Sequence, residues 1–230
     1  MFFFNNFKTR IKLSLSFSIL ILITIVVGIN GMFTAREIQN SFEDFYTERF
    51  LSNMMLATIQ LGQEKATAEM QRILYESQVT NDPTVIETSV ESINKIVAEI
   101  DSAFKEYEKG NFLPEEEELF ASLKNATSVY RSTRDKAIEA ARNGDFDMAV
   151  AHDALSRDYR EKCSDLIKQM RELNKQVADD MMEANRANFE NSRNMSILFL
   201  IIAFLVGVVF TVLFNKSIAK PIKVLEEHAG

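Results

Sequence analysis

The apolar run at residues 195–214, MSILFLIIAFLVGVVFTVLF, constrains this chain more than any other feature. It holds 20 residues without one charged side chain. At a rise of about 1.5 Å per residue, a helix of this length spans about 30 Å, which matches the hydrocarbon core of a bilayer. The run therefore predicts a membrane-spanning helix, so the segments before and after it are expected on opposite sides of a membrane.

A second apolar stretch, LSLSFSILILITIVVGINGMF, occupies residues 13–33 and follows Lys8, Arg10 and Lys12. A basic start before an apolar core is also typical of a cleaved signal peptide. This stretch, however, is long, rich in Leu and β-branched residues, without an obvious small-x-small cleavage motif, and it continues directly into a helical pattern. These features favour an uncleaved signal anchor.

Basic residues flank the outer side of both stretches, because lysines also follow the second one at positions 216, 220 and 223. Lys and Arg accumulate on the cytoplasmic side of a membrane protein. We therefore predict a multi-pass protein of the cell (inner) membrane with cytoplasmic segments at 1–12 and 215–230 and an extracytoplasmic domain at 34–194. That domain carries 20 Lys and Arg against 31 Asp and Glu, a net charge of −11. Such a charge disfavours a nucleic-acid partner.

The outer domain is expected to be helical, since the whole chain contains only 7 Gly and 3 Pro. Few turn-forming residues favour long uninterrupted helices. Turn signals occur at three places, namely Asn-Asp-Pro at 81–83, Gly-Asn-Phe-Leu-Pro at 110–114 and Asn-Gly-Asp at 143–145. Capping residues, a proline in a first helical turn and a glycine after a helix end explain all three. They predict four helices at roughly 34–80, 83–109, 114–142 and 145–194.

The apolar spacing of the last three helices predicts how they associate. Apolar residues alternate at spacings of four and three, which places one narrow stripe on each helix, as in a left-handed bundle. The stripes are Ile86, Val90, Ile93, Val97, Ile100, Phe104 and Tyr107; Leu119, Leu123, Ala126, Tyr130, Thr133, Ala137 and Ala140; and His152, Leu155, Tyr159, Leu166, Met170, Leu173 and Val177, with a phase shift near Cys163.

The first helix carries two partly apolar faces, one with Ile59, Met70 and Ile73 and another with Met54 and Leu61. Two faces predict two partners, the helix's own bundle and a second copy of the chain, and hence a symmetric homodimer. The predicted fold is all-α, an antiparallel up-down four-helix bundle flanked by two transmembrane helices. The turns at 81–83 and 143–145 are expected at the end far from the membrane.

Four segments together resemble a known family over essentially the whole chain. They are FKTRIKLSLSF at 7–17, IQNSFEDFYTERFLSNMMLATI at 38–59, NGDFDMA at 143–149 and SIAKPIKVLEE at 217–227. Their order and spacing resemble the N-terminal part of a bacterial methyl-accepting chemotaxis receptor. In that family a proline after the second span opens a HAMP domain, and Pro221 matches it as the signal-transmission junction.

The resemblance implies a chemoreceptor sensor module that passes a helix displacement through residues 195–214 to a HAMP-type output. It also implies a small polar or carboxylate ligand, such as an amino or organic acid, held near the distal end of the bundle. The sequence stops inside the first HAMP-like helix, so the downstream signalling domain is absent from it. Alternatives are the input module of a histidine kinase or nucleotide cyclase, indirect sensing through a binding protein, and a ligand-free structural bundle.

Six residues at similar depth below the distal turns are candidates for ligand binding. Guanidinium groups bind carboxylates through paired hydrogen bonds, and aromatic rings supply a shaped wall. Each residue also has a purely structural explanation, as a helix-surface ion pair or as bundle packing. The candidates are Arg72, Tyr75, Tyr130, Arg131, Arg134 and His152.

No enzyme signature is present, and no catalytic residue, metal site or cofactor is expected. The two histidines, His152 and His228, are predicted on opposite sides of the membrane, and Cys163 is the only cysteine. A metal centre or a nucleophile and base cannot be assembled from these residues within one compartment. Cys163 is expected to be a small packing residue, with a crosslink between chains as the alternative. The acidic run at 115–118 is expected to be solvated, because negative charge is favoured at a helix N-terminus.

Overall fold

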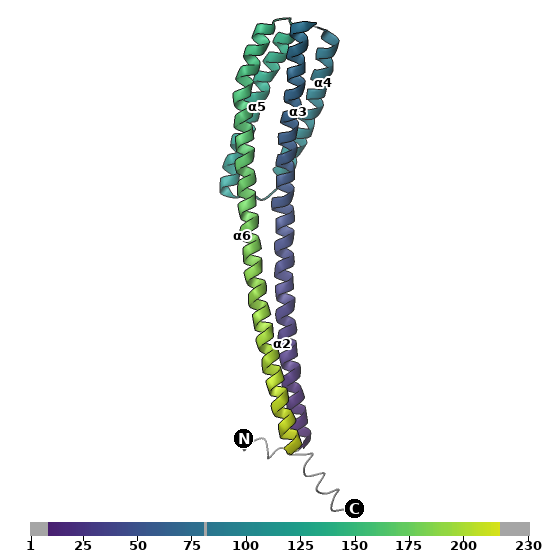
Figure 1. The fold of residues 1–230 in the computed structure, drawn as a ribbon, viewed down its shortest axis with the longest axis vertical. Helices are drawn as coiled ribbons and strands as arrows, with labels where there is room; N and C mark the ends of the chain where they lie inside the picture. The colour runs from purple at the N-terminus through teal and green to yellow at the C-terminus, as the bar shows by residue number, and fades with distance from the viewer. Residues whose placement is uncertain (1–8, 81, 217–230) are drawn as a thin grey trace, which may run out of the picture. The chain divides into compact units, whose positions relative to one another are not determined.

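The computed structural model describes residues 9–80 and 82–216. These residues form five α-helices and one π-helical turn, and they contain no strand (Figure 1). The elements are α2 Thr9–Asp44, η1 Phe45–Phe50, α3 Leu51–Val79, α4 Pro83–Tyr107, α5 Pro114–Arg142 and α6 Phe146–Phe214. The prediction of an all-α fold is confirmed.

The chain divides into two compact units. Residues Phe42–Met181 form the bundle unit, which holds η1, α3, α4, α5 and the first part of α6. Residues Met1–Ser41 and Met182–Gly230 form the paired-helix unit, whose described parts are most of α2 and the rest of α6. The two predicted kinds of segment, bundle and apolar helix pair, are therefore separate units in space.

In the bundle unit four helices run side by side (Figure 1). The turns after α3 and after α5 lie at one end, called here the turn end, and the turn between α4 and α5 lies at the other end. The π-helical turn shares that other end, because Asn111 Nδ2 donates a hydrogen bond to Glu48 Oε1 at 2.9 Å. We call it the entry end. The predicted antiparallel up-down arrangement is confirmed.

Local chemistry explains the helix boundaries at the turn end. Asp82 caps α4, since its Oδ1 accepts a hydrogen bond from the Thr84 amide at 2.8 Å, and Pro83 occupies the first turn. Asp145 Oδ1 accepts from the Met148 amide at 3.1 Å. Gly144 has φ 73°, a left-handed conformation in which glycine carries no Cβ penalty. The caps predicted from the turn signals are confirmed.

Two apolar clusters fill the bundle. The entry-end cluster contains Leu56, Ile59, Ile100, Ala103, Phe104, Tyr107, Phe120, Leu123, Ala126, Cys163, Leu166, Ile167 and Met170. The turn-end cluster contains Met70, Ile73, Ile86, Val90, Ile93, Ala137, Ile138, Ala141 and Ala149. The predicted stripe on α4 is confirmed, because its members are buried in these clusters or packed against them.

The predicted stripe on the fourth helix is wrong in its turn-end half. Leu155 is 55% exposed and Tyr159 is 37% exposed. The buried positions are instead Ala149, Ser156 and Cys163, each 0% exposed and spaced seven residues apart. Small side chains at a heptad spacing let neighbouring helices approach closely. In this turn-end half, helix α6 therefore directs its small residues to the core and its larger ones outward.

Helix α3 confirms the prediction of two different faces. Ile59 and Ile73 are 0% exposed, whereas Met54 is 53% and Leu61 is 51% exposed. Between them Gly62 allows α4 to approach, because a Cβ at this position would lie 2.6 Å from Ile100 Cγ1. The buried face belongs to the bundle, and the second apolar face is exposed to solvent in the described part of the chain.

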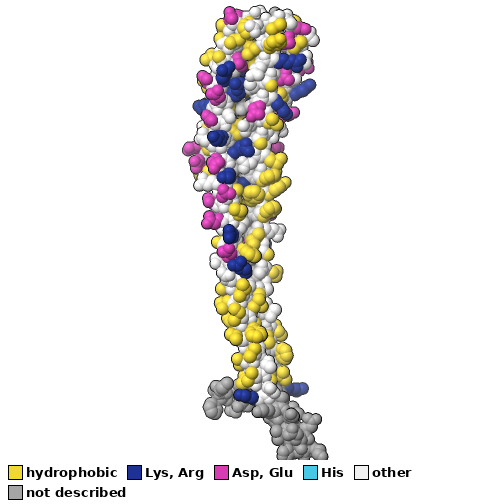
Figure 2. All heavy atoms as spheres, viewed as in Figure 1, with side chains coloured by type: hydrophobic (Ala, Val, Ile, Leu, Met, Phe, Trp, Pro, Cys, Tyr) yellow, Lys and Arg dark blue, Asp and Glu magenta, His cyan; other side chains and the backbone are white. Residues whose placement is uncertain are grey.

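The paired-helix unit presents a largely hydrophobic surface, while charged side chains cover the bundle unit (Figure 2). Phe17 is 60% exposed and Phe204 is 71% exposed. The described part of the chain contains two helices long and apolar enough to span a membrane. Exposed apolar side chains are favourable against lipid, so this surface suits the predicted spans. The span limits 13–33 and 195–214 stay predictions.

Within the paired-helix unit a few polar side chains join the two helices. Ser192 Oγ accepts hydrogen bonds from Thr34 Oγ1 at 2.8 Å and from Asn30 Nδ2 at 3.0 Å. Asn185 Nδ2 donates to Ser41 Oγ at 2.7 Å. Hydrogen bonds of this kind hold membrane helices together where no hydrophobic force acts between them.

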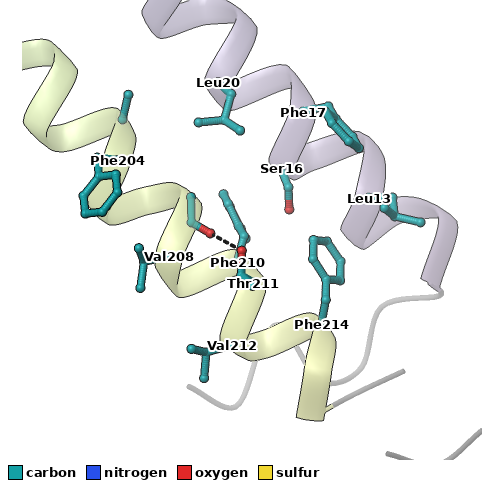
Figure 3. Close-up of a pocket in the computed structure, with 12 residues that line it drawn as sticks. Leu13, Ser16, Phe17, Leu20, Phe204, Val208, Phe210, Thr211, Val212 and Phe214 are labelled. Carbon is teal, nitrogen blue, oxygen red and sulfur yellow. Dashed lines mark hydrogen bonds between the residues drawn. The ribbon is translucent and has the colours of Figure 1, made fainter. Parts of the chain in front are cut away.

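An apolar cleft of about 620 Å³ lies between the same two helices (Figure 3). Phe17 and Leu20 line it from α2, and Phe204 and Phe214 from α6. Thr211 also lines it, but its hydroxyl donates to the Gly207 carbonyl at 2.8 Å and so is satisfied within its own helix. The predicted junction at Pro221 and the HAMP-like residues from 217 onward lie outside the described residues, as do residues 1–8.

Candidate functional site

All six predicted ligand-binding residues lie in the bundle unit, but they differ in exposure. On α3, Arg72 is exposed and Tyr75 is 62% exposed. On α5, Tyr130 is 3% and Arg134 is 5% exposed. His152 on α6 is half-buried. Similar depth along the bundle therefore does not place the six side chains in one environment.

Tyr130 and Arg134 form one buried group. The Arg134 guanidinium lies 5.7 Å from the centre of the Tyr130 ring, within the range of a cation–π contact. Its Nε and Nη2 donate to Asp135 Oδ1 at 3.1 Å and 2.7 Å. The neighbouring carboxylate thus occupies one edge of the guanidinium, the kind of partner that a ligand carboxylate would replace.

Arg131 pairs elsewhere. Its Nη1 lies 2.8 Å from Asp101 Oδ1 on α4, and its Nη2 is buried without a hydrogen-bond partner. Arg131 lines a cleft of about 370 Å³ between α4 and α5, together with Lys124 and Ser128. The unmet donor makes Arg131 the member of the predicted set that is most clearly open to an additional acceptor.

The structure brings Tyr130 and Arg134 together, and it pairs Arg131 separately. Among the described residues no hydrogen bond or ion pair joins Arg72, Tyr75 or His152 to that pair. The assignment of the six residues to one ligand site stays a prediction.

A buried ionic cluster at the entry end was not predicted. It consists of Arg49 from η1, Tyr107 from α4, Glu116 from α5 and Asn174 from α6, which are 4%, 1%, 2% and 0% exposed. Each residue comes from a different element. A polar cluster that joins η1, α4, α5 and α6 fixes the relative positions of these four elements at that level.

The hydrogen bonds of the cluster converge on the Glu116 carboxylate. Arg49 Nη1 donates to Glu116 Oε2 at 3.0 Å and to Asn174 Oδ1 at 2.9 Å. Tyr107 Oη donates to Glu116 Oε1 at 2.5 Å, and Asn174 Nδ2 donates to the same oxygen at 3.4 Å. Both carboxylate oxygens are engaged, which compensates for the cost of removing the charges from water.

The expectation of a solvated acidic run is wrong for Glu116, although Glu115, Glu117 and Glu118 are exposed. Glu116 is the third residue of α5, and its Oε2 also accepts from the Leu113 amide at 3.4 Å. The start of α5 was predicted from the sequence. The burial of Glu116 against Arg49 depends on how the π-helical turn packs against α5, which the sequence does not show.

One signal in the sequence pointed to this cluster. Asn174 follows Met170 by four residues on a face that is otherwise apolar, and a lone amide on such a face requires polar partners.

Burial, followed by the hydrogen bond to Glu116, raises the pKa of Tyr107 far above its ordinary value. Tyr107 is therefore a neutral donor at physiological pH.

The sequence is similar to that of known sensory proteins over most of its length. Residues 6–189 match the family described as "Four helix bundle sensory module for signal transduction". The chain belongs to this family. This sensory module is also 22% identical over 223 residues to "Putative sensory transducer protein YvaQ" of Bacillus subtilis (strain 168), a match that covers 95% of the chain and 38% of that relative. No solved structure matches the chain.

These matches confirm the resemblance to the sensor part of a chemotaxis receptor and a role of the sensory module in signal transduction. Together with the two apolar helices, they indicate a membrane protein. The chain spans 38% of the length of this relative.

Cys163 lies in the core of the sensory module. Its side chain is 0% exposed, and its sulfur lies 3.6 Å from Thr127 Oγ1. Burial raises the pKa of the Cys163 thiol, which lowers the population of the reactive thiolate. The expectation of a packing residue is confirmed.

Proposed function

We propose that this chain is the sensor portion of a transmembrane chemoreceptor. In this proposal the bundle unit is extracytoplasmic, both chain ends are cytoplasmic, and a displacement of α6 passes the signal to a HAMP-type output beyond Pro221. The supporting observation is that α6 runs from Phe146 to Phe214 as one helix. The same helix carries the core residue Met170 and the apolar run, so no break in secondary structure separates them.

The buried ionic cluster supplies an element that such a displacement would bias. Asn174 joins α6 to Arg49 and Glu116, so a shift of α6 changes the geometry of both hydrogen bonds. A ligand shifts such an equilibrium only by its differential affinity for the two packings. Coupling energies of about 1–3 kcal/mol are typical and suffice to change an output several-fold.

The proposed ligand is a small polar or carboxylate molecule, such as an amino or organic acid. Arg72, Arg131 and the Tyr130–Arg134 pair offer guanidinium groups, which suit carboxylates. The test is calorimetric titration of the whole chain in lipid nanodiscs with a panel of amino and organic acids. We expect a saturable heat that is lost in Arg72→Ala or Arg134→Ala and retained in Lys136→Ala, an exposed control on α5.

If no acid of the panel gives a saturable heat while the chain keeps its helicity, the result would instead favour the alternatives. These are indirect sensing through a binding protein and a ligand-free structural bundle.

The proposed topology has its own test. Glu118→Cys places a thiol on the exposed surface of α5, away from the exposed apolar face of α3, and Cys163→Ala removes the buried native thiol. In intact spheroplasts a membrane-impermeant maleimide is expected to label this variant without lysis. Labelling that requires lysis would place the bundle unit in the cytoplasm.

A homodimer along α3 completes the proposal. Met54, Leu61, Ala68 and Tyr75 recur every seven residues and are exposed, which is the spacing of a helix–helix seam. Oxidation of Leu61→Cys in membranes is expected to give a covalent dimer. Glu118→Cys, exposed on α5, is the matched control and is expected to stay monomeric.

A further inference from the structure

The apolar cleft between α2 and α6 has no free hydroxyl donor to offer a ligand. It encloses about 620 Å³, and its walls are built mainly from Leu, Phe and Val side chains. Its two hydroxyl groups donate within their own helices, Ser16 Oγ to the Lys12 carbonyl at 2.8 Å and Thr211 Oγ1 to the Gly207 carbonyl at 2.8 Å. Cavities with apolar walls stay free of water and bind apolar molecules. The cleft therefore suits a hydrocarbon chain.

The space inside the cleft is open at Gly207. A Cβ atom added there would contact nothing within 4 Å beyond its own stretch of helix. Small residues in membrane helices usually let two helices approach closely, but α2 does not fill the space beside this glycine. Phe214 projects from α6 toward Ser16 and Leu13 of α2 and forms one end of the cleft (Figure 3). Because folded proteins leave few voids of this size, the cleft needs an occupant.

The end of the cleft that holds Leu13 and Phe214 is basic. Arg10 lies about one helical turn before Leu13, Lys216 lies two residues after Phe214, and both basic side chains are exposed. Lys and Arg side chains stand at this end of the hydrophobic surface (Figure 2). A chain bound in the cleft would therefore have cations next to its end.

No carboxylate along the two helices balances these cations. The nearest acidic residues on α2 and α6 are Glu37 and Glu190, about 40 Å away along the helix axes. The sequence contains no Asp or Glu at 1–36 or at 191–225. This end of the paired-helix unit therefore carries a positive charge that attracts an anionic group.

We propose that the cleft binds an anionic phospholipid of the surrounding membrane. One acyl chain occupies the space at Gly207 between α2 and α6, and Arg10 and Lys216 bind the negatively charged headgroup. Anionic headgroups attract basic residues beside a membrane helix, and guanidinium groups bind phosphate through paired hydrogen bonds. Of the proposed function, this inference uses only the membrane location of α2 and α6. It stands whichever way the chain is oriented and whatever the bundle unit binds.

Charge favours a lipid over a helix from a second copy of the chain. Ala203, Gly207 and Thr211 recur every four residues and line the cleft, a spacing that also suits close helix packing. A symmetric second copy, however, would bring the same cations to the same depth, where like charges repel. An anionic lipid neutralises them instead.

A bound lipid would act at the end of the paired-helix unit that is far from its hydrogen bonds. Asn30 and Thr34 bond to Ser192, and Asn185 bonds to Ser41, at the other end of this unit. At the cleft the spacing of α2 and α6 would then depend on the acyl chain between them. The lipid composition of the membrane thus contributes to the relative position of the two helices.

The test uses tryptophan as a reporter of lipid contact, because the chain has no tryptophan of its own. Phe210→Trp places the reporter on the wall of the cleft, and Val209→Trp places it at a 55% exposed position that does not line the cleft. The two positions differ in depth by only about 1.5 Å. Each full-length variant is reconstituted in phosphatidylcholine vesicles with a minor fraction of brominated phosphatidylglycerol or brominated phosphatidylcholine, whose bromine atoms quench tryptophan fluorescence on contact.

We expect brominated phosphatidylglycerol to quench Phe210→Trp at least about twofold more strongly than brominated phosphatidylcholine does, and both lipids to quench Val209→Trp equally. In the Phe210→Trp background, Arg10→Gln/Lys216→Gln is expected to abolish the preference for phosphatidylglycerol. Arg36→Gln/Arg193→Gln removes two exposed charges from the other end of the same unit and is expected to retain it.

A further pair of variants tests the acyl chain separately from the headgroup. Gly207→Leu fills the open space of the cleft, so we expect weaker quenching of Phe210→Trp by both brominated lipids. Gly28→Leu adds the same side chain to α2 outside the cleft, where a Cβ atom also has open space, and is expected to leave the quenching unchanged.

Four results would overturn the proposal. They are equal quenching of Phe210→Trp by the two lipids, a preference that survives Arg10→Gln/Lys216→Gln, an equal loss of preference in Arg36→Gln/Arg193→Gln, and a Phe210→Trp reporter that no lipid quenches while Val209→Trp is quenched. The last result would show that a second copy or the chain itself closes the cleft. Absence of quenching at both positions would contradict the membrane location itself, so a failure of the proposed function is distinguishable from a failure of the lipid site.

Discussion

The two ends of the bundle unit are closed in different ways. At the turn end two short connections join the helices covalently, and the core there is apolar and built on small residues such as Ala141 and Ala149. At the entry end α3 and α6 have no connecting turn, and Arg49, Glu116 and Asn174 hold the elements together through buried hydrogen bonds.

The two ends of the bundle differ in how strictly they fix the positions of their helices. Apolar contacts are tolerant of small slips between helices, whereas a buried charge is stable only with its partners in place. The entry end, where covalent constraint is weakest, has the interaction that is least tolerant of displacement. Substitutions at the two ends are therefore expected to lower the free energy of unfolding by different amounts and with a different dependence on pH.

Glu116→Ala is expected to have the largest effect, because it removes the closer carboxylate partner of the buried Arg49 and leaves it only the longer contact with Glu48, at 3.6 Å, among the described residues. Breaking a buried ion pair on one side typically costs about 3–5 kcal/mol of unfolding free energy. Chemical denaturation of the chain in detergent micelles, followed by circular dichroism, measures it. Glu115→Ala, exposed on the same turn, is the control and is expected to change stability by less than about 0.5 kcal/mol. A loss below about 1 kcal/mol in Glu116→Ala would contradict the role of the cluster.

Tyr107→Phe is expected to cost about 1.5–3 kcal/mol at neutral pH, the range for a hydrogen bond to a charged group. Its second effect is on pH dependence. The raised pKa keeps the Tyr107 hydroxyl protonated in the folded chain, while the unfolded chain ionises near its ordinary value of 10.0. Above that pH the folded state binds more protons, so stability falls by up to about 1.4 kcal/mol per pH unit.

The measurement is thermal unfolding at pH 8, 10 and 11. The wild type is expected to lose more stability with rising pH than Tyr107→Phe does. Tyr75→Phe, at a 62% exposed position, is the control and is expected to follow the wild type. Parallel pH profiles for all three proteins would show that Tyr107 ionises equally in both states.

Asp82→Ala tests the turn end, where a cap replaces the buried cluster. Loss of the hydrogen bond from the Thr84 amide to Asp82 is expected to cost about 1 kcal/mol. The same denaturation experiment measures it, with Glu99→Ala, exposed within α4, as the control. A loss as large as that of Glu116→Ala would remove the difference between the two ends.

Glu87→Gln is expected to have the smallest effect. Arg142 donates to Glu87 at 2.6 Å and 2.7 Å, but both side chains are about half exposed, and water and salt screen such pairs. The hydrogen bond from Arg142 lowers the pKa of Glu87. The contribution of the Glu87–Arg142 pair to stability is therefore fully present above pH 4.5, near the pKa of Glu87 in the unfolded chain. It is lost as the pH falls through the lower pKa of Glu87 in the folded chain.

The expected shift in Tm for Glu87→Gln is smaller than that for Asp82→Ala, and it disappears in 1 M salt because the Debye length there is only about 3 Å. A shift that persists in high salt would indicate a stronger, desolvated pair at the turn end.

Much of the fold was predictable because its signals are local. The turns at 81–83, 110–114 and 143–145 and the stripe on α4 depend on residues close together in the chain, and the structure confirms them. The stripe on α6 failed near Leu155 because small residues, which carry a weak hydrophobic signal, form the buried face there.

The candidate site was less predictable. Arginines and aromatic residues at similar depth were identified, but exposure and pairing divide them, as Arg72 and Arg134 show. The contact between Gln60 on α3 and Arg171 on α6 was not predicted either. Its residues lie about 100 positions apart in the chain, and only packing brings Gln60 to Arg171.

The sequence by itself determined the helical class, the helix ends at the three turns, the two apolar helices and the family, because composition, capping residues and spacing act over a few residues. The tertiary structure decided that Glu116 is buried, that Asn174 joins α6 to the entry end, and that Lys168, Arg171 and Lys175 line one cleft. These facts depend on which faces of separate helices meet, and that choice is made by the summed packing of the whole bundle.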